Sequence, residues 1–422
     1  MTLHQTVHTP DRAACGCDAA PGLLPVDDAI AIGLALLRPL AETEHLPLAR
    51  ATGRVLARDI AAPVALPLFD NAGMDGYALR LSDLAGQGPW FLPVAGRIRA
   101  GDAASPLPQG AAMRILTGAP VPAGADAVIA QEQVARRAAR IEIAQRPRNG
   151  QHIRRAGEDV ALGAPLLEAG RLLGAREIAA LAGSGVGQVP VTRRLRVSVL
   201  CSGSELVPPG APLGPGQIWN ANQAMLGAAL AQPWIALRLR PALADTPALL
   251  QKHIAKTLRD TDILITTGGV SVGDEDHMAR VIQNLGGQIH AMKLAMKPGK
   301  PLSIGQVGQT LWLGLPGNPV AAFVTWHVVG QVLAQALAGM ARPGPVKSLA
   351  ALAAPLRHSP GRCEFRPARL LGHDARGLQQ VACLEGTGSH RLAQFPQADA
   401  LVMIPADMDA LPKGALVEVL PL

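Results

Sequence analysis

Three acidic side chains follow successive short apolar runs in the middle of the chain. The acids are Glu205, Asp245 and Asp276. If the apolar runs are parallel strands of one sheet, their carboxyl ends share an edge and the carboxylates converge there. Converging carboxylates repel one another unless a cation lies among them or one is protonated, and hard oxygen ligands suit Mg²⁺. The spacing therefore predicts a magnesium site, although acids in loops are also commonly helix caps or solvated charges.

A glycine-rich loop and a group of lysines accompany these acids. The loop, residues 266–273, reads TTGGVSVG, and its backbone N–H groups can approach an anion with a helix start behind them. It is neither a Walker loop nor a dinucleotide fingerprint. Lys293 and Lys297 follow, and on an extended strand they project from the same face. An anion site beside a divalent cation suits phosphoryl chemistry, whereas a solvated charged face is the ordinary alternative.

The elements that must position these groups are predicted from apolar periodicity and turn residues. Strands are expected over 195–200, 235–239 and 262–267, and helices over 26–40, 175–182, 220–232, 246–259 and 276–285. Strand–helix alternation at this spacing predicts a largely parallel sheet covered by helices. Residues 61–153 carry turn signals about every eight to twelve positions, which predicts an all-β module, and 346–422 predict a second one.

Composition narrows the class of protein. The chain has 422 residues, a net charge of +7, 49% hydrophobic and only 3% aromatic residues. This length suits about three domains, and the basic balance favours anionic partners. Few aromatics and the lack of a long basic run argue against nucleic acid. Five scattered cysteines form no disulfide framework and predict a reducing cytoplasm.

Two segments bear on localisation. Residues 1–20 predict a disordered tail without the apolar core of a signal peptide. Its possible metal ligands match no standard zinc spacing: His4, His8, Cys15 and Cys17. Residues 320–341 approach the ~20 apolar residues of a membrane span. One polar stripe recurs along them every four residues: His327, Gln331 and Gln335. A buried helix, not a membrane span, is therefore predicted.

Several sequence motifs, in this order, resemble the molybdopterin molybdenumtransferase family, which includes the E domain of gephyrin. They are Phe69–Ala78, Leu116–Pro120, Arg154–Val160, Gly203–Leu206, Gly268–Gly273, Lys293–Pro301, Leu315–Pro319 and Gly388–His390. By composition alone, the first of them, which contains the only tyrosine, predicts no more than a turn beside a strand. The resemblance extends from about Leu24 to the C-terminus.

The resemblance implies a multidomain α/β plus all-β fold in an elongated subunit with a central α/β, molybdopterin-binding-like domain. The expected division is a tail over 1–20, a linker domain over 21–60 and 154–192, an inserted β domain over 61–153, the α/β domain over 193–345 and a C-terminal β domain over 346–422. It also implies a homodimer and a Mg²⁺-dependent reaction in which molybdate replaces AMP on adenylylated molybdopterin. Expected partners are the adenylyltransferase of the pathway and the molybdoenzymes that receive the cofactor, without nucleic acid or membrane.

Residue roles carry over motif by motif. The resemblance assigns Glu205, Asp245 and Asp276 to the metal, and Lys293 and Lys297 to molybdate and to charge on the departing phosphate. It assigns catalytic roles to Asp75 in the inserted domain and to Asp159 at its edge, where they would reach the partner subunit's site. The implied substrate-binding residues are Thr117, Ser204, Gly268, Gly269, Ser271, Pro298, Pro316, Gly317, Asn318, Arg362 and Ser389.

Departures from the family pattern leave alternatives open. The usual Thr-Gly-Asp-Glu-Leu appears as residues 202–206, SGSEL, so Ser204 replaces a carboxylate, and His277 stands where tyrosine is common. Cys201 is expected to be a core residue rather than a nucleophile. A binding scaffold would need a partner groove between the α/β and C-terminal domains. The adenylyltransferase of the pathway would share the α/β domain but not the two flanking β modules.

Overall fold

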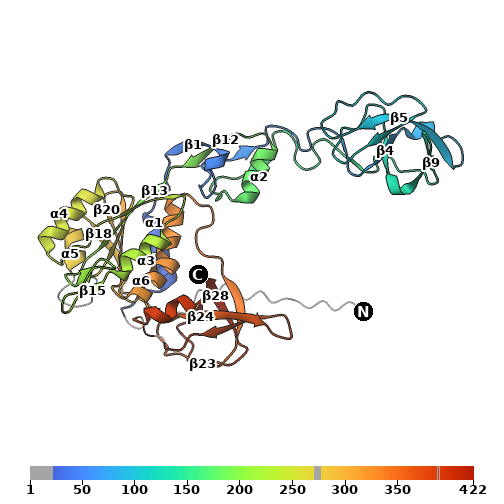
Figure 1. Cartoon of the computed structure of the whole chain (residues 1–422). Coiled ribbons are helices and arrows are strands. Elements are labelled where there is room, and N and C mark those ends of the chain that lie inside the picture. The colour runs from blue at the N-terminus through green and yellow to red at the C-terminus, as the bar shows by residue number, and fades with distance from the viewer. Residues whose placement is uncertain (1–21, 270–276, 387, 389) are drawn as a thin grey trace.

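The computed structural model describes residues 22–269, 277–386, 388 and 390–422. The tail with its His and Cys residues, and three predicted site residues, Ser271, Asp276 and Ser389, lie outside these ranges. The subunit is elongated: a β domain at one end is joined through a slender linker to an α/β domain and a C-terminal β domain at the other (Figure 1). The predicted fold class is confirmed.

The central sheet of the α/β domain carries the predicted alternation. Its strand order is β16-β13-β17-β21-β20-β18. These strands are β13 (Leu195–Cys201), β16 (Ile235–Leu239), β17 (Ile263–Thr267), β18 (Gln288–Met292), β20 (Ser303–Val307) and β21 (Thr310–Leu315). The first four in spatial order are parallel. Strand β20 is antiparallel to β21, and β18 is antiparallel to β20, so β18 again runs in the direction of the first four. The carboxyl ends of β13, β16, β17 and β21 therefore share one edge.

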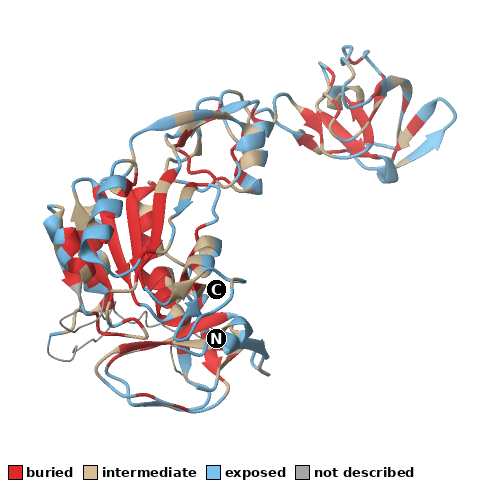
Figure 2. Ribbon diagram, turned by 60° about the vertical axis from the view of Figure 1, so that its left-hand side comes forward, coloured by how far each residue is buried: buried red, intermediate tan, exposed pale blue. Residues whose placement is uncertain are grey.

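Helices cover both faces of this sheet because alternate side chains of each strand point to opposite faces. On one face, Leu200, Leu264 and Trp312 pack against α4 (Pro247–Leu258) and α5 (His277–Asn284). The other face packs against α1 (Val26–Leu36), α3 (Ala221–Ala229) and the long helix Pro319–Leu337. Strands β13, β17 and β21, in the middle of the sheet, are almost wholly buried between these layers (Figure 2).

The long helix is apolar enough in length and composition to cross a membrane, yet 72% of its apolar window is buried in the fold. It consists of α6 (Pro319–Thr325), one π-helical turn (Trp326–Gly330) and α7 (Gln331–Leu337). The predicted buried helix is confirmed.

Some predicted helix ends are wrong by a few residues. Helix α1 ends at Leu36 instead of residue 40, and Leu37 is already extended. Helix α3 ends at Ala229 instead of residue 232. Proline at 39 and at 233 disfavours continuation of these helices through residues 38 and 232, since a residue before proline avoids the helical region. Thr246 occupies the N-cap of α4, but its side chain makes no capping hydrogen bond.

The predicted extended strand through the lysines is also wrong. Strand β18 ends at Met292, and Lys293 has a φ of +63°. The chain turns there and resumes as the short strand β19 (Met296–Lys297), which pairs in parallel with β24 of the C-terminal domain. Lys293 and Lys297 therefore do not share one strand face.

Both predicted all-β modules are confirmed. The inserted domain contains β4 (Gly76–Leu79), β5 (Trp90–Ile98), β6 (Ala112–Ile115), β7 (Ala127–Ala130), β8 (Val134–Arg137) and β9 (Arg140–Ile143) in the order β7-β4-β6-β5-β9-β8. The C-terminal sheet contains β22 (Ser348–Leu352), β24 (Cys363–His373), β25 (Gln379–Cys383), β26 (Ala400–Ile404) and β28 (Leu416–Pro421). Each of the two β domains packs around a core of mainly aliphatic side chains.

The linker domain joins chain segments that are far apart in sequence. Antiparallel pairs connect β1 (Thr43–Pro47) to β12 (Gln188–Thr192) and β2 (Ile60–Ala61) to β11 (Pro165–Leu167). A further pair, β3 (Asn71–Ala72) with β10 (Ile153–Arg154), belongs to the inserted domain, since Ala72 and Ile153 pack in its core. The predicted helix at 175–182 is α2 (Ala175–Gly183).

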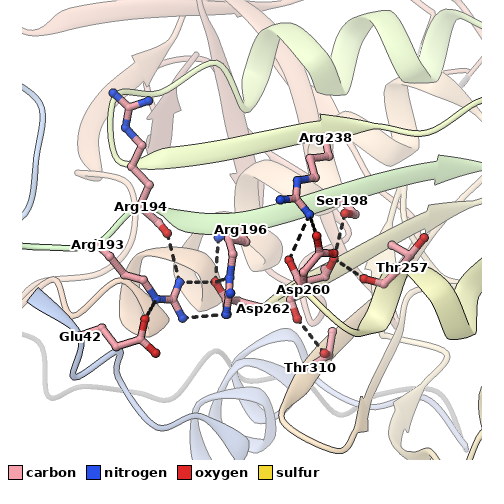
Figure 3. Close-up of polar contacts among 11 residues, drawn as sticks. Glu42, Arg193, Arg194, Arg196, Ser198, Arg238, Thr257, Asp260, Asp262 and Thr310 are labelled. Atoms are coloured by element: carbon pink, nitrogen blue, oxygen red, sulfur yellow. Dashed lines mark hydrogen bonds and ion pairs between the residues drawn. The ribbon is translucent and has the colours of Figure 1, made fainter.

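An ion-pair network fixes the linker domain to the amino end of the central sheet (Figure 3). Asp262 accepts two hydrogen bonds from Arg193, at 2.6 and 3.0 Å, and further ones from the backbone N–H and guanidinium of Arg196. Arg193 also contacts Glu42 of the linker domain. Burial alone would raise the pKa of Asp262, but the hydrogen bonds from Arg193 and Arg196 hold it below its ordinary value.

Candidate functional site

The loops at the carboxyl edge of the sheet are hydrogen-bonded to one another. Ser202 N–H donates to the carbonyl of Thr267 at 2.9 Å, and Gly203 N–H donates to the carbonyl of Leu243 at 2.9 Å. The segments that lead to Glu205, Asp245 and Gly268 therefore meet at one edge, as parallel strands dictate.

Close backbone approach explains the glycines at this edge. Gly268 has a φ of +90°, and a Cβ there would lie 2.2 Å from the carbonyl oxygen of Ser202. The Glu205 carboxylate folds back over Gly203, where a Cβ would lie 2.6 Å from Oε2. At Gly268 only glycine fits without displacing the backbone of the neighbouring loop, whereas a Cβ at Gly203 would require the Glu205 carboxylate to move. Gly269, with a φ of +66°, continues the loop.

The carboxylates at the edge suit a hard divalent cation. Glu205 and Asp245 are exposed, and in the described part of the chain neither is paired with a basic side chain. Their oxygens are the donors that Mg²⁺ prefers, with water and phosphate completing its shell. Among the described residues no group of three His, Cys, Asp or Glu side chains has metal-site geometry. The third predicted ligand, Asp276, lies outside the described ranges, and Ser204 is exposed beside Glu205.

The loop Pro316–Asn318 follows β21 at the same edge. Asn222, in the first turn of α3, donates from Nδ2 to the carbonyl of Gly317 at 2.7 Å. Asn222 Oδ1 and Ser202 Oγ are buried and have no hydrogen-bond partner within the described chain. Sequence reasoning missed Asn222, although an asparagine two residues after the α3 N-cap at Asn220 was a detectable signal.

The predicted cationic residues lie where the α/β and C-terminal domains meet. The pairing of β19 with β24 sets Lys297 opposite Glu364, and Cys363 N–H donates to the carbonyl of Ala295 at 2.9 Å. Arg362, which is partly buried, immediately precedes this pairing. Lys293 is exposed on the preceding turn.

A pocket opens at this domain junction. Its lining comes from both domains: Pro298, Val320, Glu364, Phe365, Arg366, Pro367, Leu384, Gly386, Gly388, Arg391, Gln394 and Phe395. Val320 lies in the first turn of α6, directly after the Pro316–Asn318 loop, so the junction pocket adjoins the loops at the sheet edge. Gly388 is adjacent to Ser389, whose placement falls outside the described ranges.

A buried carboxylate that the sequence prediction omitted lies at this junction. Glu364 is 1% exposed and receives Lys297 Nζ at 3.2 Å and Arg366 at 2.9 and 3.1 Å. His358 Nε2 lies 3.5 Å from its other oxygen. Burial by itself would raise the pKa of Glu364, but Arg366 and Lys297 hold it below its ordinary value. The sequence Arg-Cys-Glu-Phe-Arg over 362–366, in which a glutamate stands between two apolar residues and two arginines, was the pattern that could have indicated a buried, ion-paired Glu364.

Asp75 and Thr117 meet in the inserted domain. The Thr117 hydroxyl and N–H donate to Asp75 Oδ1 at 2.7 and 2.8 Å, and these bonds lower the pKa of Asp75. Asp159 is exposed where the linker segment leaves the inserted domain, and its N–H donates to the carbonyl of Leu66. Within one subunit the inserted domain lies at the end opposite the acidic loops (Figure 1). The single subunit therefore does not unite these residues with Lys297 and Glu205.

Cys201 is a buried core residue, as expected. Burial raises the pKa of its thiol despite hydrogen bonds with Thr267 and Asn220, so the thiolate needed for nucleophilic chemistry is disfavoured.

Comparisons with known proteins cover nearly the whole chain. Three family models match: the MoeA N-terminal region (domain I and II) over residues 24–185, a probable molybdopterin binding domain over 198–335, and the MoeA C-terminal region (domain IV) over 350–422. The molybdopterin molybdenumtransferase of Haemophilus influenzae is 36% identical over 94% of this chain and 98% of its own. Molybdopterin molybdenumtransferase 2 of Mycobacterium tuberculosis is 37% identical over 89% of this chain and 94% of its own.

Solved structures agree with the sequence relatives. The crystal structure of a molybdopterin biosynthesis MoeA protein from Pyrococcus horikoshii OT3 matches with a TM-score of 0.81 and 28% identity over 95% of this chain and all of that one. The order of domains, the motifs at the sheet edge and the full-length relatives all lead to one conclusion. This chain belongs to the molybdopterin molybdenumtransferase family, the transferases of molybdenum cofactor biosynthesis.

Proposed function

We propose that this transferase inserts molybdate into adenylylated molybdopterin in a Mg²⁺-dependent reaction that releases AMP and the molybdenum cofactor. The observation that carries the proposal is the junction pocket, which is lined by Arg366 and Arg391 with Lys297 beside it and adjoins hydrogen-bonded loops that end in unpaired carboxylates. An oxyanion and a phosphate ester need positive charge, and a phosphate-bound divalent cation needs carboxylate oxygens.

In this proposal each loop has a separate task. Glu205 and Asp245, with Asp276 as the further predicted ligand, would hold Mg²⁺, which neutralises charge on the phosphate when bound. Backbone N–H groups of the Gly268–Gly269 turn and of the Pro316–Asn318 loop would orient the phosphate and pterin. Further predicted substrate-binding residues on these loops are Ser204 and Ser271.

The cationic junction would bind the molybdate. Lys297, Lys293 and Arg362 would attract the oxyanion and stabilise charge on the departing AMP, with Pro298 at the pocket wall. Ser389 is a further predicted substrate-binding residue. The ammonium of Lys297 is the best placed of these groups, because its tether to Glu364 keeps it beside the pocket.

A homodimer would complete the site. Asp75 and Thr117 are hydrogen-bonded to each other yet lie at the far end of their own subunit. In a two-fold dimer of elongated subunits, the inserted domain and Asp159 at its edge can reach the α/β domain of the other copy. We place the enzyme in the cytoplasm, between the adenylyltransferase of the pathway and the molybdoenzymes that receive the cofactor.

AMP release tests this function directly. Purified protein with adenylylated molybdopterin, Mg²⁺ and molybdate should release AMP, and chelation of Mg²⁺ or omission of molybdate should abolish the release. Glu205→Gln should reduce turnover, whereas Glu168→Gln, an exposed acid in the linker domain, should not. No AMP above background from the wild-type protein would reject the proposal. AMP transfer from ATP to unmodified molybdopterin would instead identify an adenylyltransferase.

A groove between the α/β and C-terminal domains meets the requirement of the scaffolding alternative. It is lined by Val26, Ile30, Val332, Pro345, Phe365 and Met403, among others. Glu205 and Asp245 nevertheless remain at the sheet edge, and a scaffold has no use for them, so catalysis is the function that the site supports best.

A further inference from the structure

The junction pocket contains one acidic side chain among its basic ones. Lys297, Arg366 and Arg391 are basic and lie in or beside the pocket, while Glu364 is buried in its wall. An oxyanion pocket gains nothing electrostatically from a carboxylate, which repels the ligand. Glu364 therefore needs another explanation than ligand binding.

The contacts of Glu364 provide that explanation. Its Oε1 receives Arg366 Nε at 2.9 Å and Lys297 Nζ at 3.2 Å, and its Oε2 receives Arg366 Nη2 at 3.1 Å. Arg366 is anchored further by a hydrogen bond to the carbonyl of Arg357 at 2.6 Å. A carboxylate that is 1% exposed is stable only when its oxygens are fully occupied by such partners.

Among the partners of Glu364, Lys297 differs from Arg366 because it belongs to the α/β domain, whereas Glu364 and Arg366 belong to the C-terminal domain. Strand β19 supplies it, and the pairing of β19 with β24 holds its backbone opposite Glu364. Its side chain is 33% exposed, so the ammonium reaches both the buried carboxylate and solvent. A free lysine side chain samples many rotamers, whereas one tied at both backbone and ammonium has lost that freedom before any ligand arrives.

We propose that Glu364 is a positioning residue, which holds the Lys297 ammonium in place for the oxyanion and the departing phosphate. The proposal rests on the proposed function and adds a residue whose task is to orient a cation, not to touch substrate. It also makes the site depend on the docking of the C-terminal domain against the α/β domain, since each domain supplies one half of the tether.

Chemical labelling tests the tether without any turnover. An amine-reactive acylating reagent must approach the amine nitrogen, so a lysine whose nitrogen is held against a buried carboxylate and is partly covered reacts slowly. In the full chain, Glu364→Gln should speed acylation of Lys297 by about five-fold or more, as read by mass spectrometry. Lys293 and Lys300 are exposed on the same turn and should change by less than about two-fold, which makes them internal controls. Unchanged labelling of Lys297 would overturn the proposal.

Turnover tests the positioning role through a double-mutant cycle. Glu364→Gln should lower kcat for AMP release by about ten-fold with little change in the KM for molybdate, and Glu364→Asp should recover part of the loss. In a Lys297→Ala background, Glu364→Gln should have almost no further effect. Equal losses in both backgrounds would show a merely structural role and refute the idea. Absence of AMP release from the wild-type protein would refute the proposed function instead, while the labelling result would still decide whether the tether exists.

Discussion

Asp262 should stabilise the junction between the linker and α/β domains far more than its neighbour Asp260 does. Asp262 accepts hydrogen bonds of 2.6 and 3.0 Å from Arg193, whose side chain is only 14% exposed (Figure 3). Hydrogen bonds between charged groups contribute about 1.5 kcal/mol or more each, so the pair contributes about 3 kcal/mol. Arg196 is 40% exposed, and solvent screening reduces its share to about 0.5 kcal/mol.

The expected cost of Asp262→Ala is therefore about 3.5 kcal/mol, or about 400-fold faster hydrogen exchange at the β13 and β17 amides. Asp260→Ala is the matched control: Asp260 is 46% exposed and pairs with the exposed Arg238, so its loss should cost about 0.5 kcal/mol. Hydrogen exchange with mass spectrometry measures each domain separately, which a global unfolding curve of a multidomain chain does not. Amides of the inserted domain should be unaffected.

Two results would refute this reasoning. One is an equal effect of the Asp260 and Asp262 substitutions, which would mean that burial does not set the strength of the pair. The other is exchange in β13 that stays within about three-fold of wild type after Asp262→Ala.

The same contact predicts a pH dependence. The folded-state pKa of Asp262 is lowered, so its contribution is complete above the unfolded value of about 3.9 and is lost as pH falls through the folded value. The ratio of β13 amide exchange rates between Asp262→Asn and wild type should thus be constant near neutral pH and should shrink as the pH falls below about 4.

Three further outcomes are expected. Gly268→Ala should lower AMP release by about ten-fold or more because its Cβ would lie 2.2 Å from Ser202 O, whereas Gly286→Ala, with a similar φ but open space, should retain activity. Thr117→Val should return the pKa of Asp75 toward its ordinary value in a carboxyl NMR titration, and an unshifted titration would contradict the assigned hydrogen bond. Thiol reagents should leave Cys201 unmodified in the folded protein. Mass spectrometry measures the modification, and a rapid reaction of Cys201 would show that its thiol is not buried.

The main strands and helices of the α/β domain, and the residues at its sheet edge, could be predicted from the sequence alone. Alternating strands and helices between 195 and 285 follow from apolar periodicity, and a parallel sheet places the ends of its strands at one edge. That local logic was enough to bring the Glu205, Asp245 and Gly268 loops together. It was also enough to identify the long apolar helix as an interior one from its polar stripe.

The contacts that join residues of different domains became visible only in the tertiary structure. No local pattern shows that Lys293 turns the chain or that β19 adds to a strand more than sixty positions away, because pairing partners of an edge strand are not encoded in its own residues. Glu364 likewise looks like an ordinary strand residue until the fold buries it against Lys297 and Arg366. The distance between the inserted domain and the acidic loops is a further property of the folded chain, since it depends on how rigid bodies are joined and not on any motif.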